Sequence, residues 1–440
     1  MQEATYRKRL AADLPMWLDA GWLTADGATA ILASIATGGR RSTFGFSAIL
    51  GTLGALLLGL GVIAFIGSNW EELPRILRFG LIVAAMIVAY GAAFEFDRRN
   101  LRIFAEAGVL AAGLVYAGGI ALVGQTYHLA GDFGGAVLLF EAGILGAALF
   151  TGSPTMTVLG LVGAGYWTWL STYDHGIAPH WPSLVAIGFG VLVTTVQNSH
   201  YGRIVAILAF MFWLSLTIVA MGDHHDWSFA GGLALLAGAA LATWALGAAL
   251  ASITAVPRVA ALGDAILWPG LFAILLTLGI LQLAETPTVN ESDLLIHILI
   301  TMGAAIAFAG LAFLRKYLTL VDLITVALLA AVATAFALSV PTDDLTQRLA
   351  GGIMVIVASL WAVSLGQSGR HPIGKIIGLF AFGCEIIYLY VFTLGTRLDT
   401  ALAFLVGGVL FIVLAYILFR IDRILARRAI APEPTAEVTP

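Results

Sequence analysis

The chain has 440 residues, of which 60% are hydrophobic and 11% charged, with a formal net charge of −4 at pH 7. A soluble domain carries roughly 25% charged residues, so the composition excludes a soluble protein of this size, whose surface needs more charge. The single cysteine, Cys384, excludes an intramolecular disulfide or a thiolate metal site.

Residues 1–43 are the polar N-terminal segment. The apolar spacing predicts two short helices, at 6–20 and 24–36, separated at Gly21, with Thr24 as the N-cap of the second. Two interpretations remain open for this cytoplasmic amphipathic segment: a hairpin that docks a partner or regulates the protein, and a helical pair that rests on the membrane surface.

Fourteen apolar runs follow, most of them near the 20 residues that cross roughly 30 Å of hydrocarbon. They lie near 44–67, 79–96, 103–123, 134–150, 155–171, 183–198, 203–221, 229–251, 262–283, 294–314, 318–340, 348–366, 373–394 and 400–420. The second should begin at Pro74. We therefore predict an all-α polytopic membrane bundle of about fourteen transmembrane helices. Seven lie in residues 44–221 and seven in 229–420, and a disordered cytoplasmic tail occupies 429–440.

The distribution of basic residues predicts the topology. With the N-terminus in the cytoplasm, almost all of the 22 Lys and Arg residues fall in cytoplasmic segments. The exceptions are Arg75, Arg78, Arg348 and Arg397. This is the bias of the positive-inside rule, so we expect both termini in the cytoplasm. The lipid bilayer is the expected partner, and we expect no nucleic-acid partner.

Three glutamates at membrane depth stand out: Glu106 in the third run, Glu141 near the middle of the fourth and Glu385 near the middle of the thirteenth. A charge at membrane depth is costly and usually faces a cavity or a partner. The three are candidates for ion coupling, as a proton or cation relay. The alternative is a protonated carboxyl that is hydrogen-bonded between helices. Asp264 and Asp322 lie at the inner ends of their runs and are expected at the interface.

Five of the eight histidines fall in predicted outer loops, with aspartates beside them. The densest group is Asp223, His224, His225 and Asp226. Imidazole and carboxylate suit a divalent ion, but the spacing matches no metal motif. We therefore predict no metal and no cofactor, and keep this group as a weak metal candidate. Gly374 and Gly378 form a small-xxx-small pair that predicts close helix packing.

Two stretches carry a resemblance to a known family: Gly59 to Pro74, which contains Asn69 and Trp70, and Gly124 to Asp132, which contains Gln125, Tyr127 and His128. Together with the segment from Trp17 to Thr24, they resemble the bacterial membrane-protein family called domain of unknown function 2157, over about residues 10–155. The resemblance implies a bacterial cytoplasmic-membrane protein and no mechanism. It points to an outer-face polar motif of Asn69, Trp70, Gln125, Tyr127, His128 and Asp132.

Three functions are compatible with these features. The first is a transporter or flippase of a solute or lipid-linked substrate, with Glu141 and Glu385 as coupling residues. The second is a non-transporting cell-envelope scaffold or sensor with a membrane or periplasmic protein partner. The third is a metal-dependent membrane-embedded enzyme. The usual catalytic motifs are absent from the sequence, so we do not expect an enzyme.

Overall fold

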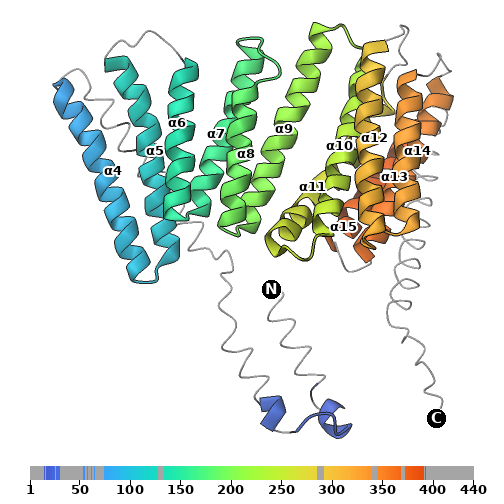
Figure 1. Cartoon of the computed structure of the whole chain (residues 1–440), viewed down its shortest axis with the longest axis horizontal. Helices are drawn as coiled ribbons and strands as arrows, with labels where there is room; N and C mark the ends of the chain where they lie inside the picture. Colours follow the sequence, from blue (N-terminus) through green and yellow to red (C-terminus); the bar gives the residue numbers. More distant parts are fainter. Residues whose placement is uncertain are drawn as a thin grey trace, which may run out of the picture. The chain divides into compact units, whose positions relative to one another are not determined.

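The computed structural model describes residues 14, 16–24, 26–29, 53–54, 57, 61, 64, 74–126, 133–284, 292–338, 344–367, 372–390 and 392. These residues contain the helices α4–α15 (Figure 1). Nine of the described helices are long and apolar enough to cross a membrane, and α8 and α13 are apolar but shorter. The protein is therefore an all-helical, polytopic membrane protein. The chain divides into two compact units, Met1–Val123 and Gly124–Pro440.

In the first unit, α4 (Arg75–Arg98) and α5 (Arg102–Thr126) form an antiparallel pair. Glycines on α5 set their separation. A Cβ atom at Gly108 would lie 3.0 Å from the Cβ of Ala93, and one at Gly119 would lie 2.7 Å from Cγ2 of Ile82. Close packing through small residues is a usual way for helices to associate in a membrane.

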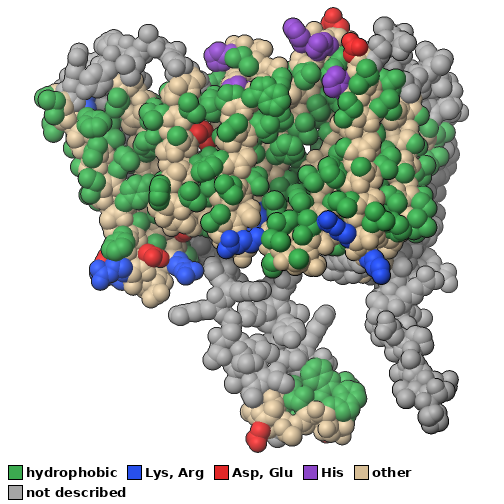
Figure 2. Space-filling model, in the orientation of Figure 1, with side chains coloured by type: hydrophobic (Ala, Val, Ile, Leu, Met, Phe, Trp, Pro, Cys, Tyr) green, Lys and Arg blue, Asp and Glu red, His purple; other side chains and the backbone are tan. Residues whose placement is uncertain are grey.

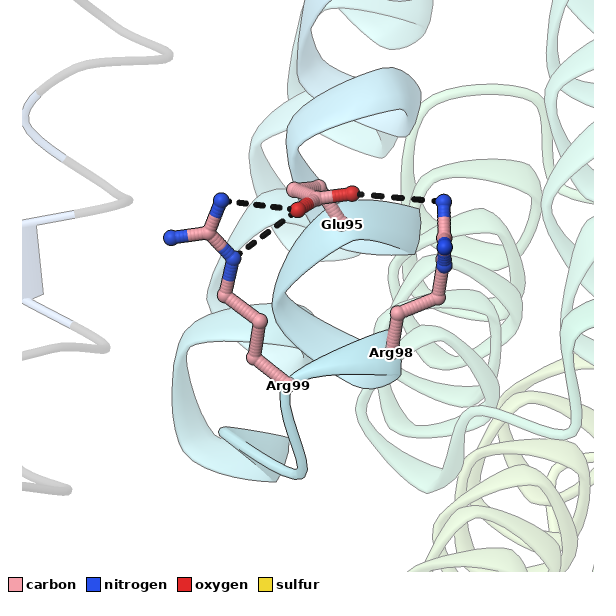
Figure 3. Close-up of polar contacts among 3 residues, drawn as sticks. All are labelled: Glu95, Arg98 and Arg99. Carbon is pink, nitrogen blue, oxygen red and sulfur yellow. Dashed lines mark hydrogen bonds and ion pairs between the residues drawn. The ribbon is translucent and has the colours of Figure 1, made fainter.

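An ion-pair cluster closes the C-terminal end of α4 (Figure 3). One carboxylate oxygen of Glu95 accepts a hydrogen bond of 2.8 Å from Nε of Arg99, and its other oxygen lies 3.8 Å from Nη1 of Arg98. The cluster is solvent-exposed, so each pair contributes only about 0.3–0.5 kcal/mol. The two arginines also complement the negative end of the helix dipole.

The N-terminal segment contains the predicted break between two short helices. Gly21 has a positive φ of +70°, a conformation that glycine adopts without strain. The Thr24 hydroxyl accepts a hydrogen bond of 3.2 Å from the backbone N–H of Gly27, which confirms Thr24 as an N-cap. A small apolar cluster joins the two sides: Leu14, Trp17, Leu23 and Ala28.

The first helices of the second unit are α6 (Phe133–Thr151), α7 (Pro154–Tyr173), α8 (Trp181–Val196) and α9 (His200–His224). We call these four helices the α6–α9 group. Their core contains Leu145, Leu161, Ile187 and Trp213. Ser153 and Ser199 cap the N-termini of α7 and α9, each accepting a hydrogen bond from a backbone N–H three residues later.

The remaining helices are α10 (Phe229–Ala251), α11 (Pro257–Leu281), α12 (Ser292–Leu314), α13 (Leu320–Leu338), α14 (Asp344–Gln367) and α15 (Pro372–Tyr390). We call these six helices the α10–α15 group. The α10 helix is rich in alanine and glycine and is buried along most of its length. It packs against α9, α11, α12 and α13, so it is the central helix of this group.

Glycine interfaces hold this group together. A Cβ atom at Gly263 of α11 would lie 2.5 Å from the carbonyl oxygen of Gly247 on α10. On α15, a Cβ atom at Gly378 would lie 2.6 Å from the carbonyl oxygen of Ser359, and one at Gly374 would lie 3.2 Å from that of Ala362. The predicted packing role of Gly374 and Gly378 is therefore confirmed.

Charged side chains separate between the two ends of the second unit (Figure 2). One end, which we call the cationic end, carries Arg203, Arg258, Arg315, Lys316 and Lys375. Most of the described histidines and aspartates lie at the opposite end, at the end of α7, between α9 and α10 and at the start of α12. His200, Asp264 and Asp322 lie nearer the cationic end. Arg348, near the start of α14, also lies at the opposite end.

Twelve of the fourteen predicted apolar runs correspond to the described helices α4–α15, with ends that differ by a few residues. The helix predicted to begin at Pro74 has Pro74 as its N-cap. The runs 44–67 and 400–420 and the tail 429–440 lie wholly or mostly outside the described residues. The α7 helix has the required length, but glycine, threonine, tryptophan and tyrosine lower its hydropathy, and it is not among the nine.

Candidate functional site

Glu141 occupies the middle of α6, and its side chain is buried, with 2% of the residue exposed. Neither carboxyl oxygen has a hydrogen-bond partner among the described residues. The side chain lies against Gly163 of α7, where a Cβ atom would be 2.5 Å from Glu141 Oε1 and would also meet the ring of Phe140. Because residue 163 is glycine, there is space at this position for the carboxyl group of Glu141.

The surroundings of Glu141 decide its charge. Among the described residues, no hydrogen-bond donor, charged or neutral, reaches either carboxyl oxygen of Glu141. An unpaired ionised carboxylate in an apolar interior is far more costly than a neutral one. Even a neutral carboxyl leaves polar atoms unsatisfied, at about 1–3 kcal/mol. In this conformation the neutral, protonated form of Glu141 therefore costs less free energy than the ionised form, although both destabilise the fold.

Glu385 is the second buried carboxyl, at 3% exposure, and lies on α15. Its Oε2 accepts a hydrogen bond of 2.9 Å from Nε2 of Gln282. Gln282 is the C-cap of α11 and is itself 4% exposed. The other oxygen of each group, Oε1 in both residues, has no hydrogen-bond partner among the described residues. The pair is therefore only half satisfied.

Two consecutive glycines of α14 accommodate this pair. A Cβ atom at Gly351 would collide with the Cβ of Gln282, and one at Gly352 would lie 3.0 Å from Oε1 of Glu385. The pair is thus enclosed between the ends of α11, α14 and α15. Sequence reasoning missed Gln282, since a glutamine at the end of an apolar run gives no sign of a partner 103 residues away.

Glu141 and Glu385, two of the three predicted ion-coupling residues, lie in different helix groups of the second unit. Glu141 belongs to the α6–α9 group, where α6 packs mainly on α7 and α8. Glu385 belongs to the α10–α15 group, where α15 packs on α14 and α11. Glu106 lies in the other unit, near the start of α5, and its side chain is only partly buried. No described contact joins Glu141 to Glu385.

The weak metal candidates lie at and after the C-terminus of α9. The rings of His224 and His225 are 5.1 Å apart and nearly perpendicular, and His225 stacks on Trp227 at 5.6 Å. Asp223 and Asp226 flank the two histidines and are exposed. Within the described part of the chain, no group of three or more His, Cys, Asp or Glu side chains is placed to hold a metal ion.

Most of the outer-face polar motif cannot be placed. Asn69, Trp70, Tyr127, His128 and Asp132 lie outside the described residues, and Gln125 is in the last turn of α5 with its side chain outside them. The motif remains a prediction from the sequence.

Two polar groups that the sequence places in or beside loops are buried. His180 precedes α8 at 7% exposure, hydrogen-bonds through Nδ1 to Ser183 Oγ at 2.6 Å, and packs edge-on against Trp167. Burial lowers the pKa of its imidazole. Arg203, at 4% exposure, donates to Asn198 Oδ1 at 3.1 Å. Histidine and arginine beside a predicted loop are expected to be solvent-exposed, so the burial of these two side chains was not predictable.

Asp322 lies in the first turn of α13, and its side chain is buried in the protein. Its expected position at the membrane interface stays a prediction. One oxygen accepts hydrogen bonds of 2.8 Å from the backbone N–H and the hydroxyl of Thr319, and the other accepts one of 3.0 Å from Nε1 of Trp361. The carboxylate thus caps α13 and joins it to α14. Its role is structural.

Comparison with known proteins agrees with the sequence resemblance. No curated protein and no solved structure matches the chain. Residues 15–157 match the model of a family described as "Predicted membrane protein (DUF2157)". The match covers the N-terminal third of the chain and ends at the start of α7, so it includes Glu141 but not Glu385. The N-terminal third of this protein is thus similar to a family of predicted membrane proteins.

Proposed function

We propose that the protein is a proton-coupled transporter or flippase of a solute or lipid-linked substrate, with Glu141 as its coupling residue. One observation carries the proposal: a carboxyl in the middle of an apolar helix, buried, with neither oxygen hydrogen-bonded among the described residues. Ionisable groups at membrane depth usually serve substrate or proton pathways. A group held at such a cost is a candidate for function.

The α6–α7 interface is suited to movement around this group. Gly160 and Gly163 give α7 a smooth face towards α6. By contrast, the cationic end of the interface is fixed. Gln197 donates to the backbone carbonyls of Ala148 and Ser153, at 2.9 and 3.3 Å. Separation of α6 and α7 at the end opposite the cationic end would let water reach Glu141. Hydration would favour loss of its proton.

A pH jump on proteoliposomes adsorbed to a solid-supported electrode tests this proposal without knowledge of the substrate. Proton uptake by a group inside the membrane moves charge across part of the bilayer and gives a transient current. We expect the wild type to give this current and Glu141→Gln to give a clearly smaller one. Glu95→Gln, which removes an exposed carboxylate, is the matched control and should keep the signal. A full-sized current from Glu141→Gln would refute the proposal.

A non-transporting scaffold or sensor is the second candidate, and two observations favour it. Glu141 and Glu385 lie in different helix groups, which a single transport pathway does not explain. The N-terminal segment exposes Met16 at 60% and Trp22 at 75%, which suits a partner or the membrane surface. Deletion of residues 1–43 should then abolish recovery of a cross-linked partner. Recovery of the chain alone in mild detergent would count against this function.

We further propose that the protein lies in the bacterial cytoplasmic membrane with the cationic end in the cytoplasm, as the positive-inside rule suggests. Single cysteines in a Cys384→Ala background test this. Thr254→Cys, at the cationic end, should react with a membrane-impermeant maleimide only in inverted vesicles. Asp223→Cys, at the other end, should react in spheroplasts. Both positions are exposed. The reverse pattern would contradict the proposed topology.

A further inference from the structure

Two buried oxygen atoms of the Glu385–Gln282 pair have no hydrogen-bond donor. The amide N–H of Gln282 bonds to Oε2 of Glu385, but Oε1 of Glu385 and Oε1 of Gln282 are both buried acceptors without a donor among the described residues. An ionised carboxylate only accepts hydrogen bonds, and so does an amide oxygen. With Glu385 ionised, the pair therefore leaves two acceptors unsatisfied, where each should have a partner.

We propose that Glu385 and Gln282 form a proton-binding site, in which a proton on Oε1 of Glu385 is donated to Oε1 of Gln282. Carboxylic acid and amide then form a ring of two hydrogen bonds, one in each direction. No covalent bond to carbon changes, since the proton comes from solvent and returns to it. Small rotations close the ring, because the terminal torsions of Glu and Gln are broad.

The surroundings support a site for a proton rather than for a larger ion. Glu385 Oε1 lies against Gly352, where even a single added carbon atom would be 3.0 Å away. The same carbon would be 2.8 Å from Cδ2 of Leu389. A hydrated cation would have to displace these apolar neighbours and find several more oxygen ligands. A proton needs neither.

The charged and titratable neighbours of the pair influence the pH at which it binds the proton. Arg348 of α14 lies one turn from Gly352, and its guanidinium donates a hydrogen bond of 2.8 Å to the hydroxyl of Tyr388, one turn from Glu385. A nearby cation favours the ionised carboxyl. Arg348 should therefore oppose the proton, so that the pair fills at a lower pH than it would without the arginine.

The other charged groups of the surrounding helices are remote or engaged. Asp264 precedes Gln282 on α11 by a stretch of helix roughly 27 Å long, and Arg258 is farther still. Lys375 of α15 lies at the cationic end. Asp322 of α13 is bonded to Thr319 and Trp361. Asp344 begins α14, about two turns before Gly351. Arg348 and Tyr388 each lie within about one turn of the pair's contact residues, and we expect them to tune the pair.

Infrared difference spectroscopy of the full-length protein in lipid tests the site. A protonated carboxyl gives a carbonyl-stretch band that disappears on ionisation, and hydrogen bonding lowers its frequency. In the difference spectrum between acid and alkaline pH, we expect the wild type to show one band from a hydrogen-bonded, protonated carboxyl. This band should be absent from the difference spectrum of Glu385→Gln. In Gln282→Leu, which keeps a similar volume, that band should move to higher frequency. In Arg348→Gln its titration should move to higher pH.

The controls separate the possible failures. Glu95→Gln should change only bands of ionised carboxylates. Spectra recorded in sodium and in choline at constant pH should be the same, so a sodium-dependent carboxylate band would overturn the proton site in favour of a sodium site. Absence of any band assignable to protonated Glu385 would also overturn it. The inference is independent of the proposed function, since neither result depends on Glu141 or on a transport current.

Discussion

Replacing Gly263 by alanine tests how closely α10 and α11 pack. The new Cβ atom would lie 2.5 Å from the carbonyl oxygen of Gly247, about 0.9 Å inside an ordinary contact of 3.4 Å, and would also collide with the backbone nitrogen of Ala251. Both neighbours are main-chain atoms of the central helix α10. They cannot rotate away as a flexible side chain could, so the two helices must separate locally.

The expected magnitude follows from two opposing terms. Overpacking a core costs about 1–3 kcal/mol, and a gap of 0.5–1 Å forfeits roughly a quarter to a half of the dispersion energy of each contact that it opens. The change from glycine to alanine in a helix returns about 1 kcal/mol. Because the colliding atoms belong to the main chain, we take the upper part of the overpacking range, about 2–3 kcal/mol, and expect Gly263→Ala to destabilise the protein by about 1–2 kcal/mol overall.

Gly279→Ala is the matched control, because it lies on the same helix with no atom within 4 Å of its Cβ position. Reversible unfolding in mixed detergent micelles, followed by circular dichroism or tryptophan fluorescence, gives the difference in the free energy of unfolding. We expect Gly279→Ala to be neutral or slightly stabilising. Equal stability of the two variants would refute the predicted contact between α10 and α11.

Two further predictions use the same unfolding measurement. Asp322→Ala should lower the free energy of unfolding by about 2–4 kcal/mol, because it removes a helix cap and leaves the indole N–H of Trp361 buried without an acceptor; a loss below 0.5 kcal/mol would contradict the buried capping role. His180 has a folded-state pKa below its ordinary value of 6.5, so its stabilising contribution is present above pH 6.5 and is lost as the pH falls through the folded pKa. Stability should therefore fall more steeply between pH 7 and pH 5 in the wild type than in His180→Gln, and parallel curves would count against a buried neutral imidazole.

The helices were predictable because the physical signal is local. Each needs about twenty apolar residues in succession, and polar or proline residues mark most ends, as at Pro74, Pro154 and Pro257. The glycine pair Gly374 and Gly378 was predictable for the same reason, since its spacing alone places both on one helix face.

The partners of the buried polar groups were not predictable, because they depend on which helix faces turn towards each other. The sequence places Glu141 at mid-span but not against Gly163, and Glu385 at mid-span but not against Gln282. Nor does the sequence show that Glu141 and Glu385 lie in different helix groups. The burial of Asp322 was not predictable either, because the indole that covers it comes from another helix.

We infer that Glu141 holds a proton at the α6–α7 interface, without a hydrogen-bond partner among the described residues. Infrared spectra of the protein in lipid at neutral pH, wild type minus Glu141→Gln, test it most directly. We predict a protonated-carboxyl band at a higher frequency than that of Glu385, because Glu141 has no described partner to weaken its carbonyl bond. A difference spectrum with only ionised-carboxylate bands would mean that Glu141 is charged and paired, and would contradict the account.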